Sequence, residues 1–245
     1  MAAATVSAAL LATSLSSGAA AVTHGRLEAR GVSTSGLERS SNWSGDAVTG
    51  GAYTHVTGSW IVPKVKVTKT NRYAADWVGI GGYSSNDLVQ SGTAEQSVNG
   101  HATYYAWTEI LPASESKLAG FTVHAGDAIT DDVNEVAAGS WVITVTNHAT
   151  GAVATRNLQY TSTHSSAEWI HEAPTVGFGQ SHLASSSKAV FDLGTVNGST
   201  VIGSAGTLHE IQLVGATDAT PSALDGDHDG FAVADGASSP SPPTT

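Results

Sequence analysis

Short strand-like segments recur along this chain at intervals of roughly 10–15 residues, and this spacing limits the fold more than any other feature. The clearest segment runs from His101 to Leu111. Because side chains alternate across a strand, its Tyr105, Trp107 and Glu109 should share one face. No segment of helix length has an apolar stripe with a 3.6-residue period. The pattern predicts an all-β fold, a two-sheet antiparallel β-sandwich of the concanavalin-like jelly-roll type.

The other expected strands are also short and are separated by turn residues. They cover residues 56–62, 77–80, 88–91, 128–133, 140–147, 152–161, 167–171, 189–196, 210–214 and 231–234. Residues 148–151 have a turn-like composition, so the strands on either side should form a hairpin. Trp169 falls within one of these strands, and we expect its side chain in the core.

Length and composition favour one secreted β domain. The 245 residues are 40% apolar, which is enough for one large core over residues 42–234. Ordered structure should begin near Asn42, after a linker or short pro-segment at 22–41, and a Ser/Pro/Thr tail at 235–245 should be disordered. We expect a monomer.

Charge and cysteine content narrow the possible partners and chemistry. The net charge of −11 argues against binding to nucleic acid or to anionic membranes. The absence of cysteine excludes a cysteine nucleophile, a thiolate metal site and disulfides. A domain of this size buries enough surface to fold without disulfides.

The first 21 residues have the composition of a signal peptide. They are mostly apolar or small, they end in Ala19-Ala20-Ala21, and the apolar run is too short and too often interrupted by Ser and Thr to span a bilayer. The first basic residue is Arg26, whereas a signal peptide normally begins with one. We expect a secreted protein with no membrane association after processing. A disordered Ala/Ser-rich leader is the alternative.

Motifs for serine hydrolases, zinc proteases, phosphate loops and dinucleotide binding are absent, so we expect no cofactor and no metal. Residues 225–230, D-G-D-H-D-G, match the first half of a calcium loop. The twelfth position is Gly236 rather than the Glu that such loops need, and no flanking helix is predicted. We interpret the segment as a solvated turn, with weak calcium binding as the alternative.

Three segments place polar residues inside otherwise apolar or aromatic strands: D-L-V-Q-S-G at 87–92, Y-A-W-T-E at 105–109 and A-E-W-I-H-E at 167–172. Taken with N-W-S-G at 42–45 and W-V-G-I at 77–80, they form an ordered series. This series resembles the glutamic peptidases, the eqolisin or scytalidoglutamic-peptidase-like family. The resemblance extends over most of residues 42–231 and implies a two-sheet antiparallel β-sandwich and an endopeptidase acting on polypeptides.

The resemblance also implies the catalytic pair. The family's I-L-Q-T-G and A-E-W-I-V-E segments fall on Gln90 and Glu168. Family positions near the cleft fall on Trp43, Trp77, Trp107 and Glu109. The alternative for the tryptophans is core packing, and the alternative for Glu109 is a solvated strand face. We expect the pair to face one cleft from neighbouring strands.

The chemistry of these two side chains suits peptide hydrolysis in acid. Glu168 can deprotonate the attacking water and then protonate the leaving amine, and the Gln90 amide can donate to the oxyanion. A histidine base would already be protonated in acid, whereas a carboxylate still accepts protons there and a carboxamide does not titrate.

This chain also departs from the family pattern. Gly81 and Ala94 stand where the family has carboxylates, Leu111 stands where it has tyrosine, and the cysteines of fungal members are missing. These differences affect the expected subsite preference and the acidic optimum more than the reaction itself.

Two other functions fit the same fold. A carbohydrate-active or carbohydrate-binding protein could use Glu109 and Glu168 as paired carboxylates and the tryptophans for stacking, although it gives no role to Gln90. A non-catalytic binding module is the other alternative.

Overall fold

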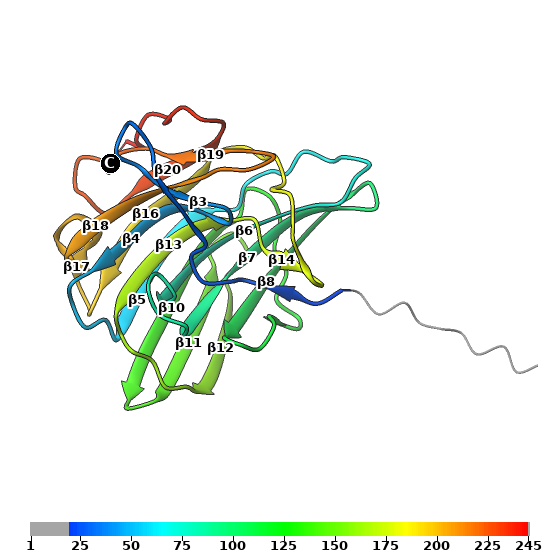
Figure 1. The fold of residues 1–245 in the computed structure, drawn as a ribbon. Helices are drawn as coiled ribbons and strands as arrows, with labels where there is room; N and C mark the ends of the chain where they lie inside the picture. The colour runs from blue at the N-terminus through cyan, green and yellow to red at the C-terminus, as the bar shows by residue number, and fades with distance from the viewer. Residues whose placement is uncertain (1–19, 245) are drawn as a thin grey trace, which may run out of the picture.

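The computed structural model describes residues 20–244, which form mostly antiparallel β-structure and one 3₁₀ turn at Ile202–Ser204 (Figure 1). Strands β3 and β18 pair in parallel. The predicted signal peptide lies outside the described residues except for Ala20 and Ala21. Within residues 20–244, no helix has the length and apolar character needed to cross a membrane.

The strands form two layers, as a β-sandwich requires (Figure 1). The front sheet contains, in spatial order, β9 (Ser116–Lys117), β8 (His101–Ile110), β7 (Leu88–Val98), β6 (Arg72–Gly81), β13 (Ser166–Glu172), β4 (Trp43–Thr49) and β18 (Thr207–Leu213). The back sheet contains β12 (Ala152–Gln159), β11 (Ser140–Asn147), β10 (Ala128–Ala137), β5 (His55–Ile61), β16 (Ala189–Val196), β20 (Phe231–Asp235) and β19 (Ala219–Pro221). Leu213 of β18 pairs with Ala219 of β19, so the sheets join at one edge.

Shorter strands complete the fold. They are β2 (Ala29–Val32) and β3 (Glu38–Ser40) beside β18, β17 (Thr200–Val201) beside β16, and a small separate sheet of β1 (Val22–Thr23), β14 (Thr175–Val176) and β15 (Gly179–Gln180). The all-β sandwich predicted from the strand spacing is confirmed.

Alternation along the strands creates two separate apolar clusters. Trp60, Trp141 and Trp169 lie in the main core between the sheets, where Trp169 was expected. A second cluster, which contains Trp43, Trp77 and Trp107, lies on the outer face of the front sheet and has no back-sheet member among the described residues. This second cluster gives the front sheet a buried outer face that an ordinary sandwich would leave to solvent.

Individual strand predictions had mixed outcomes. The hairpin of β11 and β12 and the long strand β8 are confirmed. Strands β6 and β7 are longer than the expected 77–80 and 88–91, because both continue through buried polar residues that hide the apolar pattern. The expectation that order begins near Asn42 was wrong, since residues 20–41 contain three short strands and lie partly across the front sheet.

Candidate active site

Glu168 and Gln90 lie in one row across the front sheet. Glu168 of β13 pairs with Gly79 of β6, and the same Gly79 pairs with Gln90 of β7. Directly opposed residues of a sheet project to the same face. Strand β6 separates the two residues by about two inter-strand spacings, or about 9.6 Å between Cα atoms. The expected shared face is therefore present, but the expectation of neighbouring strands was wrong.

Gly79 carries no side chain at the position between Gln90 and Glu168. A Cβ atom at this position would lie 3.0 Å from Leu88 Cδ1, 3.0 Å from Trp77 Cζ3 and 3.1 Å from Gln90 Cβ. Any larger residue would project into the region between Gln90 and Glu168. The row therefore places an amide and a carboxyl group on one face of the sheet, with no side chain at the position between them.

Glu168 is fully buried, and burial raises its pKa well above the usual value for glutamate. The Ser166 hydroxyl and the Tyr83 backbone N–H lower the pKa and the charge of Asp87 raises it, but all three effects are smaller than that of burial. Among the described residues, neither carboxyl oxygen has a hydrogen-bond partner of ordinary geometry. The raised pKa favours the protonated form of this carboxyl group.

Gln90 is also fully buried, and its Nε2 donates a hydrogen bond of 2.7 Å to the His24 carbonyl oxygen. Its Oε1 atom has no partner in the described part of the chain. Glu109 stands opposite Gln90 on β8 and accepts a 2.9 Å hydrogen bond from the His24 backbone N–H. Burial raises the pKa of Glu109 to about 8; the charge and backbone N–H of His24 oppose this rise, and the charges of Glu172 and Glu115 add to it.

The three tryptophans implied by the resemblance all lie on this face. Trp43 and Trp77 make an edge-to-face pair with ring centres 5.1 Å apart. The Trp77 indole N–H donates to Glu172 Oε2 at 2.9 Å, and that of Trp43 donates to the Gly25 carbonyl at 2.8 Å. Core packing therefore describes these side chains, which belong to the second cluster on the face that carries Gln90 and Glu168.

The chain's own residues 22–28, here called the leading segment, lie across this face (Figure 1). Its backbone is held by Glu115 N–H to the Val22 carbonyl at 3.1 Å and by Leu27 N–H to the Gly82 carbonyl at 3.0 Å. Between them, the His24 ring stacks on Trp107. A segment of the chain itself thus covers the part of this face around Gln90, Glu109 and Trp43.

Sequence reasoning missed His24, Glu115 and Glu172 as members of this site. Glu172 could have been found, because it lies four positions after Glu168 on a strand and so projects to the same face. His24 and Glu115 lie in segments without periodicity, and only the tertiary fold brings them together.

Gly81 and Ala94 stand where the resemblance implies carboxylates, and their neighbours differ. Asp87 Oδ2 would lie 3.0 Å from a Cβ atom at Gly81, whereas the residue after Ala94 does not replace the missing carboxylate. Glu95, which follows Ala94, points to the opposite face, where burial and the charge of Asp76 raise its pKa well above the usual value. Gly81 has φ of +89°, and a Cβ atom there would lie 2.5 Å from the Asp87 carbonyl oxygen. The turn after β6 therefore requires glycine in this chain.

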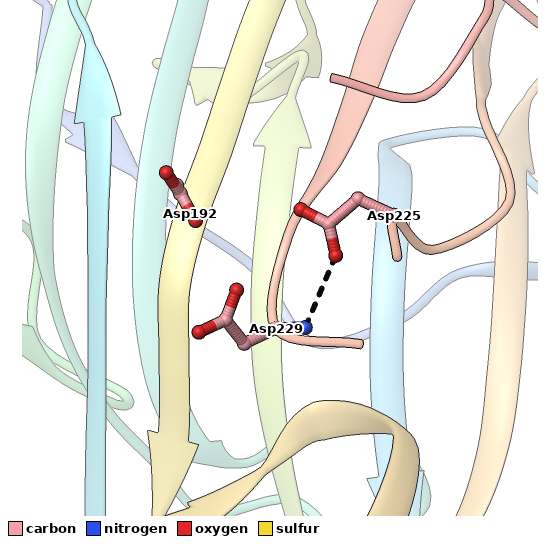
Figure 2. A group of neighbouring side chains, drawn as sticks. All are labelled: Asp192, Asp225 and Asp229. Atoms are coloured by element: carbon pink, nitrogen blue, oxygen red, sulfur yellow. Dashed lines mark hydrogen bonds between the residues drawn. The ribbon is translucent and has the colours of Figure 1, made fainter. Parts of the chain in front are cut away.

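A second acidic group lies away from the dyad, on the back-sheet side (Figure 2). One carboxylate oxygen from each of Asp192, Asp225 and Asp229 lies within 4.8 Å of the others. Asp225 is buried and its Oδ1 accepts backbone N–H groups from Asp229 at 3.3 Å and Gly230 at 3.2 Å, so this turn is less solvated than expected. Burial and the charges of Asp227 and Asp192 raise the pKa of Asp229 to about 6.

Comparison with known proteins agrees with this geometry. The model of the Peptidase A4 family matches residues 41–229. The chain belongs to the Peptidase A4 family. The resemblance to the glutamic peptidases is thereby confirmed, and the matched range includes the whole row from Glu168 to Glu109.

Relatives and solved structures of this family are similar to the chain over different lengths. Aspergillopepsin-2 of Aspergillus niger is 30% identical over 163 residues. The match covers 57% of this chain and 58% of that relative, which is less than two thirds of the relative's length. A scytalido-glutamic peptidase structure with a transition-state analogue inhibitor has a TM-score of 0.64 at 21% identity and covers 79% of this chain and 98% of its own. The aspergilloglutamic peptidase structure from Aspergillus niger has a TM-score of 0.58 at 25% identity and covers 66% and 98%.

Proposed function

We propose that this Peptidase A4 family member is a secreted endopeptidase that hydrolyses polypeptides in acid with a Gln90/Glu168 dyad. The observation that carries the proposal is the contact of Gln90 Nε2 with a peptide carbonyl, that of His24, at 2.7 Å. Donation to a peptide carbonyl oxygen is the interaction that an oxyanion donor must make.

The two side chains divide the steps of hydrolysis. Glu168 in its ionised form takes a proton from water, whose oxygen attacks the peptide carbonyl carbon. The Gln90 amide stabilises the negative charge that develops on the carbonyl oxygen. Glu168 then returns the proton to the leaving nitrogen as the C–N bond breaks. In this mechanism the water and the carbonyl would meet between the two side chains, which Gly79 separates in the row.

Burial supports a role for Glu168 in acid–base chemistry, because catalytic carboxyl groups commonly have a raised pKa. A group of this kind loses its proton at a higher pH than an exposed glutamate. Activity should therefore rise with pH on the acidic limb of the profile, as Glu168 ionises.

Secretion is the part of the proposal that rests on the sequence. Residues 1–21 have the composition of a signal peptide, and the chain lacks cysteine and carries a net charge of −11. Release of the protein into the medium on expression with its native leader, with a new N-terminus near Val22, is the expected result. Retention of residues 1–21 in the product would contradict it.

The carbohydrate-active alternative is less well supported. Its paired carboxylates would be Glu109 and Glu168, which lie in the same row with β6 and β7 between them. Three strand spacings separate their Cα atoms by about 14 Å. The Gln90 side chain also lies in the row between them, and the carbohydrate alternative gives it no role.

The experiment compares two substrate classes with the full chain. Casein and a set of soluble β-glucans are incubated with the protein from strong acid to neutrality, and acid-soluble peptides and reducing sugar are measured. We expect peptide release that increases from strong acid towards mild acid, as Glu168 ionises. Thiol reagents, serine-directed reagents and EDTA should leave it unchanged, because proton transfer by the dyad uses none of their targets. Release of sugar without release of peptides would overturn the proposal.

A further inference from the structure

The side chain of His24 fills a closed pocket beside the dyad. Its ring stacks on Trp107 with a centroid separation of 3.7 Å and an interplanar angle of 6°. Its Nδ1 lies 3.0 Å from Glu172 Oε2, and its Nε2 lies 3.0 Å from Glu115 Oε2. The histidine has no exposed surface. A flat slot with a carboxylate at each end therefore surrounds the imidazole.

We propose that this pocket, formed by Trp107, Glu115 and Glu172, is a substrate subsite for a protonated histidine side chain. The proposal rests on the peptidase function proposed above. In this interpretation the leading segment is held as a histidine-containing substrate would be, with His24 in the specificity pocket.

The arrangement of the two carboxylates selects the charged form of histidine. A neutral imidazole has one N–H and one acceptor nitrogen, whereas an imidazolium donates from both nitrogens. Both nitrogens of His24 face carboxylate oxygens, so the pocket matches two donors. Burial alone would lower the pKa of His24, but the hydrogen bonds to Glu115 and Glu172 and the charges of Glu172 and Glu109 together raise it to about 10.

Other side chains meet only part of this requirement. Phenylalanine can stack on Trp107 but donates to neither carboxylate. Lysine supplies charge and donors, but its ammonium group is a point charge that cannot stack on the indole or reach both carboxylates with a planar ring. A pocket built to hydrogen-bond a substrate group rejects analogues that leave its buried polar atoms unpaired.

Backbone contacts place the pocket next to the bond that the dyad would attack. The carbonyl oxygen of His24 accepts from Gln90, which is the contact that the proposed function assigns to the reacting carbonyl. The following N–H, of Gly25, donates to Glu172 Oε1 at 3.0 Å. The subsite therefore holds the side chain of the residue whose carbonyl is attacked, and cleavage is expected directly after histidine.

Other side chains of the leading segment make apolar or single polar contacts: Leu27 packs on the second cluster, and Thr23 Oγ1 lies 3.1 Å from Ser114 Oγ. These contacts leave the histidine as the main determinant of selectivity in our proposal. Val22 and Leu27 contact the protein through a carbonyl oxygen and an N–H, and the Gly25 carbonyl accepts from Trp43. Such contacts are available to almost any sequence. The His24 side chain, by contrast, lies between two carboxylates, those of Glu115 and Glu172.

The first test measures binding without hydrolysis. Hydrogen exchange of residues 22–28 is compared in the full chain and in His24→Phe, His24→Lys and His24→Asn variants, with His101→Asn as the control at an exposed histidine. We expect each His24 variant to exchange at least about tenfold faster in this segment and the control to match the wild type. Wild-type protection in His24→Phe would overturn the proposal, because stacking alone would then suffice.

The second test measures selectivity on substrates. Full-length His24→Asn protein, in which the leading segment is loosened, is given peptides that differ only in one residue: His, Lys, Phe or Gln. We expect cleavage directly after His, with kcat/KM at least about tenfold above the other three. Glu115→Gln should reduce this preference, whereas Glu38→Gln, a carboxylate outside the pocket, should not.

The outcomes separate the two proposals. Hydrolysis without a preference for histidine would refute the subsite and leave the peptidase function standing. A failure to cleave any of the peptides or casein would refute the peptidase function. The exchange experiment would then still decide whether the pocket binds histidine.

Discussion

Gln90 offers a way to separate oxyanion stabilisation from proton transfer, because a carboxamide does not titrate. Replacement by Ala removes one donor, and we expect kcat to fall on the order of 10²–10³ with little change in the shape of the pH profile. The profile should be measured on casein with circular dichroism as the folding control. A Gln90→Ala protein with wild-type kcat would exclude the proposed donor.

Replacement of Gln90 by Glu should act differently, because Glu109 stands directly opposite it on β8. Two adjacent carboxyl groups resist joint ionisation, so one pKa should rise. We expect the residual activity to gain a new ionisation on its pH profile. A profile that only scales the wild-type curve would show that position 90 does not act through its charge state.

The sequence predicted the site residues unevenly, and the reason is visible residue by residue. Period-two alternation placed Trp107 and Glu109 on one face of β8, and the structure agrees. The same rule applied to β13 would have added Glu172. His24 could not be predicted, because its role comes from partners that lie at least 83 positions away along the chain, at Trp107, Glu115 and Glu172.

At the scale of elements, β6 lies between the strands of Gln90 and Glu168, and its Gly79 is the residue that separates them in the row. In Gly79→Val, the added Cβ atom would lie 3.0–3.1 Å from atoms of Trp77, Leu88 and Gln90, and its methyl groups would add further contacts. We expect at least about a hundredfold loss in kcat/KM together with a moderate loss of stability from overpacking. Gly215→Ala is the control, since a Cβ atom there meets no atom within 4 Å.

Kinetics and urea unfolding should be measured on both glycine variants. Full activity in a folded Gly79→Val protein would mean that the space between Gln90 and Glu168 is not where the reaction takes place.

Element boundaries show why a fold class is easier to predict than a strand's length. The regular alternation of β11, with every second residue buried, made its bounds predictable. In β7, Ser91, Thr93 and Glu95 are buried on the inner face. Polar residues on both faces remove the apolar period on which the prediction depends, so the strand was expected to end too early.

At the scale of the whole molecule, buried carboxyl groups should make the fold most stable in acid. Asp46, Glu95 and Asp131 are fully buried, and burial raises the pKa of each, with neighbouring carboxylates adding to the shift. A raised folded-state pKa means that the folded state binds more protons than the unfolded state. The free energy of unfolding should therefore fall as pH rises above the unfolded-state values near 4.

Asp131 allows this linkage to be tested, because burial raises its pKa from 3.8 to about 8. Between pH 3.8 and about 8, Asp131 should lower the free energy of unfolding by about 1.4 kcal/mol for each pH unit of increase. We expect Asp131→Asn to reduce the slope of unfolding free energy against pH in this window, measured by urea unfolding at several pH values. An unchanged slope would show that Asp131 does not hold its proton in the folded state.

The most direct measurement is kcat of the Glu168→Gln variant on casein across the acidic range, compared with kcat of the wild type. Both proteins receive the same acid pre-incubation. The substitution keeps the shape of a fully buried side chain while removing both the base and the acid. We predict a folded protein whose kcat falls by at least about 10³ at every pH. Glu210→Gln, a carboxylate of β18 outside the row, should retain wild-type turnover. Folded Glu168→Gln protein with wild-type kcat would contradict the catalytic assignment.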